Sequence, residues 1–363
     1  MKCSYCHFAI DPGDPATERR VRYVEGLEKE IQAAPSGPAD TVYFGGGTPS
    51  LLAPAETGRL LSALRSRFTL APDAEVTLEA NPGDLDSESL ARLGELGITR
   101  LSVGAQSFDD AVLREMGRLH DADATRDLVT ATRRAGLDSI SVDMILGWPS
   151  ETPQRWREGV DQLLQLEPDH VSLYILEIDG KNVLAHRAST GALSLPPDDL
   201  VADLYLETVE RLAAAGIERY EISNFARRGA KSRHNLKYWR DEPFLGFGMS
   251  SHSYVDGRRY WNVDSYGAYC KAMESGDGSA VLAGERSLTA EVRMGEALFT
   301  GLRLVDGIDT AAFDARYGRD PLAHFGDRLE PAFAAGLLAS EEGRLRLTDR
   351  GMLLSNEVFQ LLV

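Results

Sequence analysis

The sequence predicts an α/β protein in which a mainly parallel sheet forms a barrel or partial barrel, followed by a compact winged-helix-like unit. Short runs rich in β-branched residues alternate with longer amphipathic stretches, and several of these stretches end in glycine. No Gly-x-Gly-x-x-Gly motif of a dinucleotide-binding fold occurs, which favours the barrel. The 363 residues suffice for one large domain and one smaller domain.

The elements of the first half follow from the hydrophobic pattern. Strands are expected at residues 41–44, 75–79, 99–103, 139–143 and 170–175. Helices are expected between and after them, at residues 55–67, 87–96, 122–135 and 153–166. Gly97 and Gly136 follow two of these helices, at a position where glycine commonly ends a helix. Strand, helix and strand at this spacing indicate βαβ units.

The second half changes character twice. A helix over residues 197–215 precedes a stretch dense in glycine, serine and aromatic residues, which we expect to be rich in loops, from 231 to 269. Residues 289–300 begin a new helical segment, and residues 343–348 with the helix after them predict a small β-wing. We therefore expect three parts: a partial barrel over 1–215, the end of the barrel with a loop region over 216–280, and a winged-helix-like domain over 281–363.

Composition excludes several classes of function. The net charge of -17 argues against nucleic acid or an anionic membrane surface as a general partner. No apolar run approaches the length of a membrane helix, and no signal-peptide core follows Met1. Three cysteines are too few for a secreted disulfide scaffold, so we expect a cytoplasmic protein.

Two short motifs and a set of strand ends carry the candidate chemistry. Cys3-Ser4-Tyr5-Cys6 supplies two thiolates, which suits zinc, an iron–sulfur cluster or redox chemistry but completes none of the metal sites. A glycine-rich turn, residues 45–47 with Thr48, follows the first expected strand; it either lets a ligand approach the backbone closely or is only a tight turn in which Thr48 and Pro49 start the next helix. Polar residues also stand at or just beyond strand ends, where ligands collect in parallel α/β folds: Glu79, Gln106, Arg118 and Asp143.

Together these motifs resemble the radical S-adenosylmethionine (SAM) superfamily, and within it the haem-chaperone group of the oxygen-independent coproporphyrinogen oxidase-like branch. The resemblance is carried in chain order by residues 3–6, 45–50, 78–83, 103–108, 116–120, 142–145, 220–224, 234–239 and 347–351. It implies a partial (β/α)6 radical SAM barrel with a [4Fe-4S] cluster and SAM as cofactors. Cys3 and Cys6 match the second and third cysteines of the family's C-x3-C-x2-C motif, in which three thiolates hold the cluster. The positions that match SAM-binding residues are Tyr5, Gly46, Gly47, Thr48, Glu79, Gln106, Arg118 and Asp143.

The chain departs from the family pattern in two places. The first cluster cysteine would fall four residues before Cys3, upstream of Met1, and the first barrel strand is missing with it. We expect a misplaced start or a fragment rather than genuine loss, and we expect the chain as written to hold a cluster poorly. Phe8 stands where the oxidases carry a further cysteine, and this residue sides with the chaperone group. His7, beside it, is not expected to be a ligand.

A haem site is implied by residues 234–239, because the haem-binding motif of the chaperone group is H-N-x-x-Y-W. The residues we expect to bind haem are His234, Tyr238 and Trp239. Imidazole is a common axial ligand of haem iron, although a lone histidine in an aromatic loop is usually structural. Three basic residues could meet the haem propionates: Lys231, Arg233 and Lys237. His252 is a second, weaker candidate ligand.

The resemblance implies a haem chaperone, which binds haem as cargo and transfers it to acceptor apoproteins, with respiratory enzymes as candidate acceptors. It implies SAM binding without coproporphyrinogen turnover, and it leaves open a homodimer and a peripheral membrane contact through the acceptor. The alternative is an oxygen-independent coproporphyrinogen III oxidase, which would form protoporphyrinogen IX by radical SAM decarboxylation. A third alternative is an inactive relative that keeps only the fold.

Overall fold

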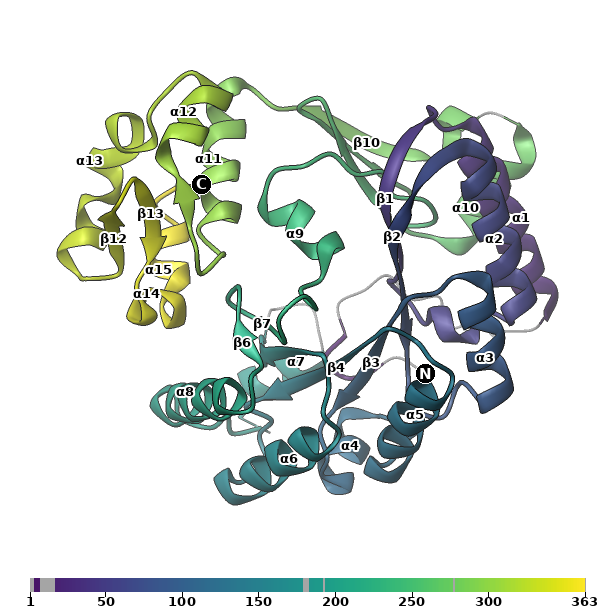
Figure 1. The fold of residues 1–363 in the computed structure, drawn as a ribbon, viewed down its shortest axis with the longest axis horizontal. Helices are drawn as coiled ribbons and strands as arrows, with labels where there is room; N and C mark the ends of the chain where they lie inside the picture. Colours follow the sequence, from purple (N-terminus) through teal and green to yellow (C-terminus); the bar gives the residue numbers. More distant parts are fainter. Residues whose placement is uncertain (1–2, 7–16, 179–182, 192, 277, 363) are drawn as a thin grey trace.

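A curled sheet of seven strands forms the centre of the computed structural model, which describes residues 3–6, 17–178, 183–191, 193–276 and 278–362 (Figure 1). The strand order is β1-β2-β3-β4-β5-β7-β6. Strands β1 to β5 are parallel, whereas β7 runs antiparallel to β5 and to β6. Their bounds are β1 (Gly37–Phe44), β2 (Phe68–Ala80), β3 (Arg100–Gln106), β4 (Ser139–Leu146), β5 (His170–Ile175), β6 (Glu218–Arg219) and β7 (Asn224–Ala226).

Helices cover the outer, convex face of this sheet (Figure 1). They are α1 (Thr17–Ala33), the 3-10 turn η1 (Pro49–Leu51), α2 (Pro54–Arg67), α3 (Ser87–Leu96), α4 (Asp110–Met116), α5 (Ala122–Arg134), α6 (Pro153–Gln165) and α8 (Asp198–Ala214), whereas α7 (Val183–Ser189) packs through Leu184 against Ile145 and Tyr5. Aspartate or threonine side chains cap several starts; for example, Asp86 accepts a hydrogen bond from the backbone of Ser89. Gly97 ends α3 in the left-handed conformation, as its position predicted.

The alternation of side chains along the strands divides the sheet into two chemically different faces. Apolar residues such as Leu78, Leu101 and Val142 face the helices and are buried in the main core. The residues between them point to the concave face, and these are largely polar, as for Glu79 and Asp143. The curled half-barrel and its helices confirm the predicted fold class.

A second sheet lies at one end of β1 and β2, in the region expected to be rich in loops (Figure 1). Its antiparallel strands pair in the order β10-β9-β8. Its elements and those around it are α9 (Arg233–Trp239), β8 (His252–Val255), β9 (Arg258–Asn262), α10 (Tyr266–Ser275), the 3-10 turn η2 (Gly278–Val281) and β10 (Leu282–Ser287). Asp256 and Gly257 both have positive φ and form the two-residue turn between β8 and β9, a turn that favours this Asp-Gly pair. The expectation of loops was therefore wrong for much of residues 231–269.

The C-terminal part folds around a core of its own, which includes Leu298, Phe325 and Leu345. Its elements are α11 (Ala290–Gly301), β11 (Ile308–Asp309), α12 (Thr310–Tyr317), α13 (Pro321–Ala334), β12 (Leu338–Glu341), β13 (Arg344–Leu347), α14 (Asp349–Leu353) and α15 (Ser355–Phe359). Strands β12 and β13 form the expected β-wing, and β11 pairs with β13. Figure 1 shows this part beside the barrel, with α9 between it and β1. The bounds proposed for the three parts of the chain stay a prediction.

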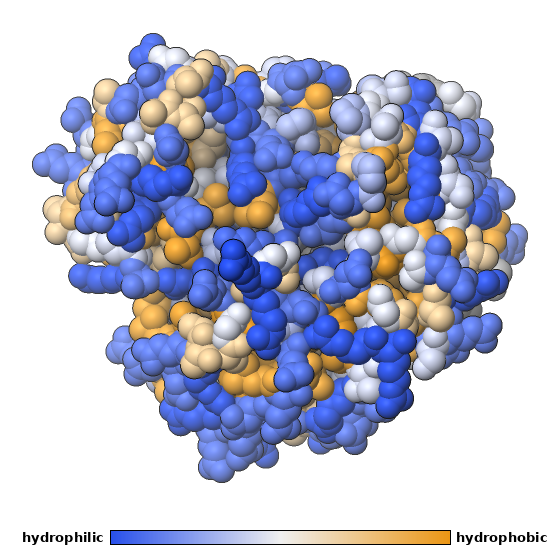
Figure 2. All heavy atoms as spheres, in the orientation of Figure 1, coloured by the Kyte–Doolittle hydropathy of each residue, from blue (hydrophilic) through white to orange (hydrophobic). Residues whose placement is uncertain are grey.

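The surface is largely hydrophilic, as the 26% of charged residues in the sequence leads us to expect. Figure 2 shows hydrophilic side chains over most of one face, with apolar side chains gathered in separate patches. Within the part of the chain that the structure describes, no helix is both long and apolar enough to cross a membrane.

Candidate functional site

The cysteine turn rests on the end of α4. The backbone N–H of Cys6 donates to the carbonyl oxygen of Cys3 at 3.2 Å, and the N–H of Ser4 donates to that of Met116 at 3.1 Å. Gly117 follows Met116 with a φ of +82°, and a Cβ on it would lie 3.9 Å from the Cα of Cys3. The turn thereby brings the Cys3 thiol within 3.8 Å of the Arg118 guanidinium.

Arg118 is fixed in a polar pocket but keeps a donor unused. Its Nη2 donates to Asn81 Oδ1 and to the carbonyl oxygen of Gly104, both at 2.7 Å. A Cβ on Gly104 would lie 3.0 Å from Gln106 Nε2 and 3.4 Å from Arg118 Nη2, so both predicted SAM residues lie over this glycine. Among the described residues, Arg118 Nε is buried without a hydrogen-bond partner. A carboxylate ligand would satisfy this orphaned donor.

The glycine-rich turn contacts Glu79 directly. Glu79 accepts hydrogen bonds from the Tyr43 hydroxyl at 2.9 Å and from the backbone N–H of Gly46 at 3.1 Å. A Cβ on Gly45 would lie 2.6 Å from the Tyr43 ring, so only glycine fits there, and Gly46 has a φ of +99°. Burial raises the pKa of Glu79 to about 7, and the charge of Asp143 adds to this rise. A cationic ligand would favour the ionised form of Glu79.

Asp143 lies on the same concave face, one strand beyond β3. It accepts hydrogen bonds from Ser102 Oγ at 3.1 Å and from Ser141 Oγ at 3.3 Å. Burial raises its pKa, while these serine hydrogen bonds and the charge of Arg100 oppose the rise. The sheet thus gathers the predicted strand-end residues Glu79, Gln106 and Asp143 on one side.

The contacts of three other predicted SAM residues, Tyr5, Thr48 and Gly47, do not by themselves indicate a ligand. Tyr5 meets the edge of Trp148 with ring centroids 6.2 Å apart. Thr48 precedes the 3-10 turn, but its side chain makes no capping hydrogen bond there. Gly47 is exposed, and a Cβ on it would meet nothing within 4 Å.

The described residues do not complete a cluster site. Cys3 and Cys6 are the two cysteines of the turn, and no group of three or more histidine, cysteine, aspartate or glutamate residues in the described ranges could hold a metal ion. The family's cluster uses three thiolates, so these residues supply two of the ligands that it needs. His7 and Phe8 lie outside the described residues.

The predicted haem ligand His234 lies against β1, on the same concave face. Its Nδ1 shares a hydrogen bond of 2.9 Å with Thr41 Oγ1, and its Nε2 shares one of 2.8 Å with the Tyr238 hydroxyl. Its ring stacks on Tyr43 with a centroid separation of 4.9 Å. Burial lowers the pKa of His234 to about 4, so the imidazole is neutral at pH 7 and keeps a lone pair for a metal.

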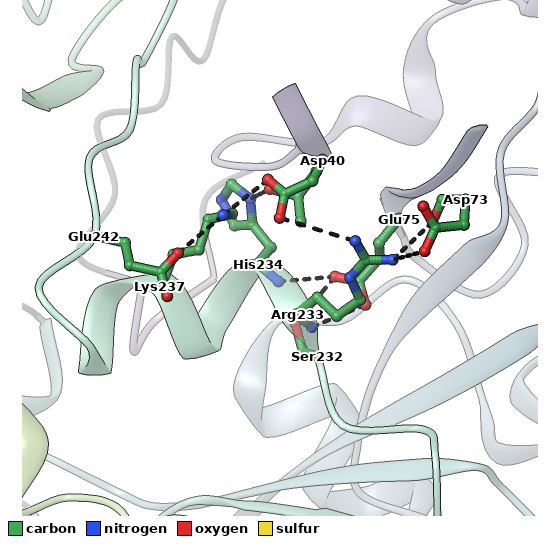
Figure 3. Close-up of polar contacts among 9 residues, drawn as sticks. Asp40, Asp73, Glu75, Ser232, Arg233, His234, Lys237 and Glu242 are labelled. Carbon is green, nitrogen blue, oxygen red and sulfur yellow. Dashed lines mark hydrogen bonds and ion pairs between the residues drawn. The ribbon is translucent and has the colours of Figure 1, made fainter. Parts of the chain in front are cut away.

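Helix α9, which carries His234, is anchored to β2 through Glu75 (Figure 3). The Glu75 carboxylate accepts the backbone N–H of Arg233 at 2.9 Å and that of His234 at 3.0 Å. Ser232 caps the helix by accepting the N–H of Asn235 at 3.2 Å. Two acceptors therefore satisfy the first backbone donors of α9.

Two of the three basic residues expected to meet haem propionates, Arg233 and Lys237, already have acidic partners (Figure 3). Arg233 pairs with Asp73 at 3.2 Å, and Lys237 pairs with Asp40 at 2.8 Å and with Glu242 at 3.1 Å. The acidic residues come from β1, from β2 and from the segment after α9. The region is therefore closer to charge-balanced than the sequence suggested, and propionates would have to compete for these cations.

The remaining residues expected near haem are Trp239 at the end of α9, His252 at the start of β8 and Lys231 just before α9. Arg303 of the C-terminal part lies over the Trp239 ring, with its Cζ 4.3 Å from the centroid. Trp239 Nε1 is buried and has no hydrogen-bond acceptor among the described residues. His252 is exposed on the second sheet, where it stacks on Trp261 at 6.0 Å. Lys231 is exposed as well.

Sequence reasoning missed Thr41, Tyr43 and Glu75, which contact the predicted residues from β1 and β2. Thr41 and Tyr43 alternate with Val42 and Phe44, which are half-buried against the main core, so period-two alternation could have placed both on the polar face. Their contacts with His234 could not be found in this way, because nearly two hundred residues separate them along the chain.

Comparison with known proteins gives family matches over both ends of the chain. Residues 1–163 match the Radical SAM superfamily, and residues 288–354 match the HemN C-terminal domain. Proteins named heme chaperone HemW are similar over almost the whole chain. That of Lactococcus lactis is 33% identical over 99% of this chain and 93% of its own length, and that of Mycobacterium tuberculosis H37Rv is 34% identical over 100% and 92%.

A solved structure shares the fold. The coproporphyrinogen III oxidase HemN of Escherichia coli, described as a radical SAM enzyme, superposes with a TM-score of 0.85. The match covers 100% of this chain and 87% of that one, at 22% sequence identity. The curled sheet, the second sheet and the C-terminal part therefore form an arrangement that a known protein also has.

Proposed function

Because this chain belongs to the HemW family of haem chaperones, within the radical SAM superfamily, we propose that it binds haem through His234 and hands it to acceptor apoproteins. The observation that carries the proposal is the placement of His234. A neutral imidazole stands on the concave face of the half-barrel, on a short helix that β1 and β2 hold in place. Tyr238 and Trp239 lie on the same helix, and their rings offer an aromatic surface on which a porphyrin can pack.

The radical SAM family implies SAM and a [4Fe-4S] cluster as cofactors. The orphaned Arg118 donor suits the carboxylate of SAM, and Glu79 suits its amine. We assign Gly46, Gly47 and Thr48 to its polar end, and Tyr5, Gln106 and Asp143 to the rest of the pocket. When bound, SAM supplies a sulfonium group that can be cleaved reductively. The described residues offer two thiolates rather than three, so we derive no step through the cluster.

The proposed acceptors are haem-dependent apoproteins, with respiratory enzymes among them. We place the transfer in the cytoplasm, because all three cysteines are free thiols, which suits a reducing compartment. Contact with a membrane would then come through the acceptor rather than through this chain, and a homodimer is the assembly we propose to test for.

A transfer experiment tests the function. The haem-loaded protein is mixed with increasing concentrations of a haem-free b-type cytochrome, and the Soret band of the acceptor is followed in time. A chaperone hands haem over within a complex, so the observed rate should rise with acceptor concentration. A rate that does not depend on the acceptor would show that haem only dissociates. Formation of protoporphyrinogen from coproporphyrinogen III by the same protein, under anaerobic reducing conditions, would overturn the proposal in favour of the oxidase.

A further inference from the structure

Both ring nitrogens of His234 are occupied by hydroxyl groups. Thr41 Oγ1 lies 2.9 Å from Nδ1, and the Tyr238 hydroxyl lies 2.8 Å from Nε2. A neutral imidazole has a single lone pair, on one of its two nitrogens. An iron atom can therefore bind His234 only where one of these two hydrogen bonds opens.

The bond to Thr41 is held by the sheet. Thr41 stands opposite Glu75 in the parallel pairing of β1 with β2, so its backbone is fixed on that side. Glu75 in turn holds the backbone N–H of His234 at 3.0 Å. Tyr43, two residues along β1, stacks on the imidazole from the same face. Opening the Thr41 bond would require a new χ1 rotamer of this β-branched side chain, which is stiff, or a shift of the strand or of the helix.

The bond to Tyr238 depends on one side chain. Tyr238 lies one helical turn after His234 on the seven-residue helix α9. Its ring is packed edge-on against Phe244, at 4.7 Å, and against His234, at 5.2 Å. Within the described residues its hydroxyl has one hydrogen-bond partner, His234 Nε2. Rotation of this side chain opens Nε2 without moving the backbone.

From this arrangement we propose that Thr41 is the positioning residue whose hydroxyl oxygen accepts a hydrogen bond from Nδ1–H of His234, and that the Tyr238 hydroxyl donates to the Nε2 lone pair until haem iron replaces it. The inference rests on the proposed haem function and adds the nitrogen that binds and the residue that must move. A hydrogen bond from the distal ring nitrogen of a metal-bound histidine fixes its tautomer and orientation. Thr41 takes this role, and Tyr238 keeps the site closed in the empty protein.

Replacing Tyr238 by phenylalanine tests the closing role. The ring is retained and the competing hydroxyl is removed, so haem should bind about three- to tenfold more tightly, as expected for loss of one hydrogen bond in the empty state. The association rate should rise with it. The measurement is an anaerobic haem titration followed by absorbance, with stopped-flow mixing for the rate. Weaker binding by Tyr238→Phe would overturn the closing role.

Replacing Thr41 by valine tests the positioning role. Valine has nearly the same shape but accepts no proton from Nδ1, so haem should bind about three- to tenfold more weakly. The iron–histidine stretching band of the ferrous complex, measured by resonance Raman spectroscopy, should move to lower frequency because the imidazole becomes less basic. Thr41→Ser keeps a hydroxyl and should restore both the affinity and the band.

Two controls separate failure of the inference from failure of the function. Thermal unfolding followed by circular dichroism establishes that each variant is folded. If His234→Ala loses haem while Thr41→Val and Tyr238→Phe bind as the unaltered protein does, the inference is wrong and the haem function stands. If His234→Ala binds haem normally, with an unchanged spectrum, the site itself lies elsewhere and both proposals fail.

Discussion

Burial sets the charge of individual carboxyl groups near the end of the parallel strands. Glu151, in the loop between β4 and α6, has its pKa raised to about 8 by burial, while a hydrogen bond from Ser107 Oγ at 3.4 Å opposes the rise. The charge of Asp109 raises the pKa further. At neutral pH the folded protein therefore holds a proton that an unfolded chain, with an ordinary glutamate, would release.

Because Glu151 keeps this proton, we predict that the stability difference between the unaltered protein and Glu151→Gln depends on pH. A raised acid pKa contributes stability below the unfolded value of 4.5, and this contribution is lost as pH rises toward about 8. Glu151→Gln removes the titration, so the variant should gain stability relative to the unaltered protein between pH 5 and pH 9. Between the unfolded and the folded pKa of Glu151, the difference in free energy of unfolding between the two proteins should grow by about 1.4 kcal/mol for each pH unit. Urea unfolding followed by circular dichroism measures the difference.

The exposed Glu158 on α6 offers a matched control for that exchange. Glu158→Gln changes the same chemical group at a solvated position, and its effect should stay within about 0.5 kcal/mol. A stability difference for Glu151→Gln that is equal at pH 5 and pH 9 would contradict the assignment of the buried proton.

Among the elements, α9 depends most on distant parts of the chain. Its first donors are bound by Glu75, and its side chains pair with acidic residues of β1 and β2. Glu75→Ala should leave two backbone N–H groups without an acceptor, which costs about 1–3 kcal/mol and loosens the helix start. Hydrogen exchange measured by mass spectrometry should become faster in peptides that cover residues 231–240.

Asp73→Ala is the matched control for this prediction. Asp73 lies on the same strand and pairs with Arg233, but 81% of its side chain is exposed. An exposed ion pair contributes little stability, so exchange in α9 should change little. Equal acceleration by both variants would show that Glu75 has no special role as an anchor.

The elements differ in how well the sequence predicted them. The five parallel strands and helices α2, α3, α5, α6 and α8 were predicted within a few residues at most ends, because their apolar periodicity and end signals agree. An exception is β2, which begins at Phe68 rather than at residue 75. The hairpin of β8 and β9 was missed although Asp256-Gly257 is a strong turn signal, since glycine and serine around it suggested loops. Helix α1 was not predicted either; its Glu30 is bound by Gly248, Asn262 and Tyr269, far along the chain.

On the scale of the whole molecule, Arg303 joins the C-terminal part to the barrel and to α9. It pairs with the fully buried Glu221 at 3.2 Å and lies over the Trp239 ring. Asn224 donates a further hydrogen bond to Glu221. Burial raises the pKa of Glu221, and Arg303 is the largest opposing influence. Removing the cation would leave a buried carboxylate without its partner.

This link predicts a non-additive pair of substitutions. Arg303→Ala should lower the free energy of unfolding by roughly 3–5 kcal/mol, because it strands the charge of Glu221. Adding Glu221→Gln removes that charge, so the double variant should be more stable than Arg303→Ala alone. Urea unfolding of the four proteins in the cycle measures the coupling. A double variant that is less stable than Arg303→Ala would contradict the role of the ion pair.

The candidate site could be predicted only in part, for a reason that belongs to the whole molecule. Glu79, Gln106 and Asp143 could be found because the ends of parallel strands meet at one edge of a sheet. His234 was found through its motif alone. Both of its partners, Thr41 and Tyr238, carry a hydroxyl group. Only the docking of α9 on β1 shows that the Thr41 hydroxyl comes from a paired strand of the sheet, whereas the Tyr238 hydroxyl comes from a side chain of α9 itself.

The measurement that tests this account most directly is an anaerobic haem titration of the protein beside His234→Ala, with His252→Ala as control. We predict saturable one-to-one binding with a Soret band typical of a histidine ligand, lost in His234→Ala and kept in His252→Ala. Binding that is unchanged in His234→Ala and lost in His252→Ala would contradict the account, because it would place haem on the exposed face of the second sheet rather than on the helix held by β1 and β2.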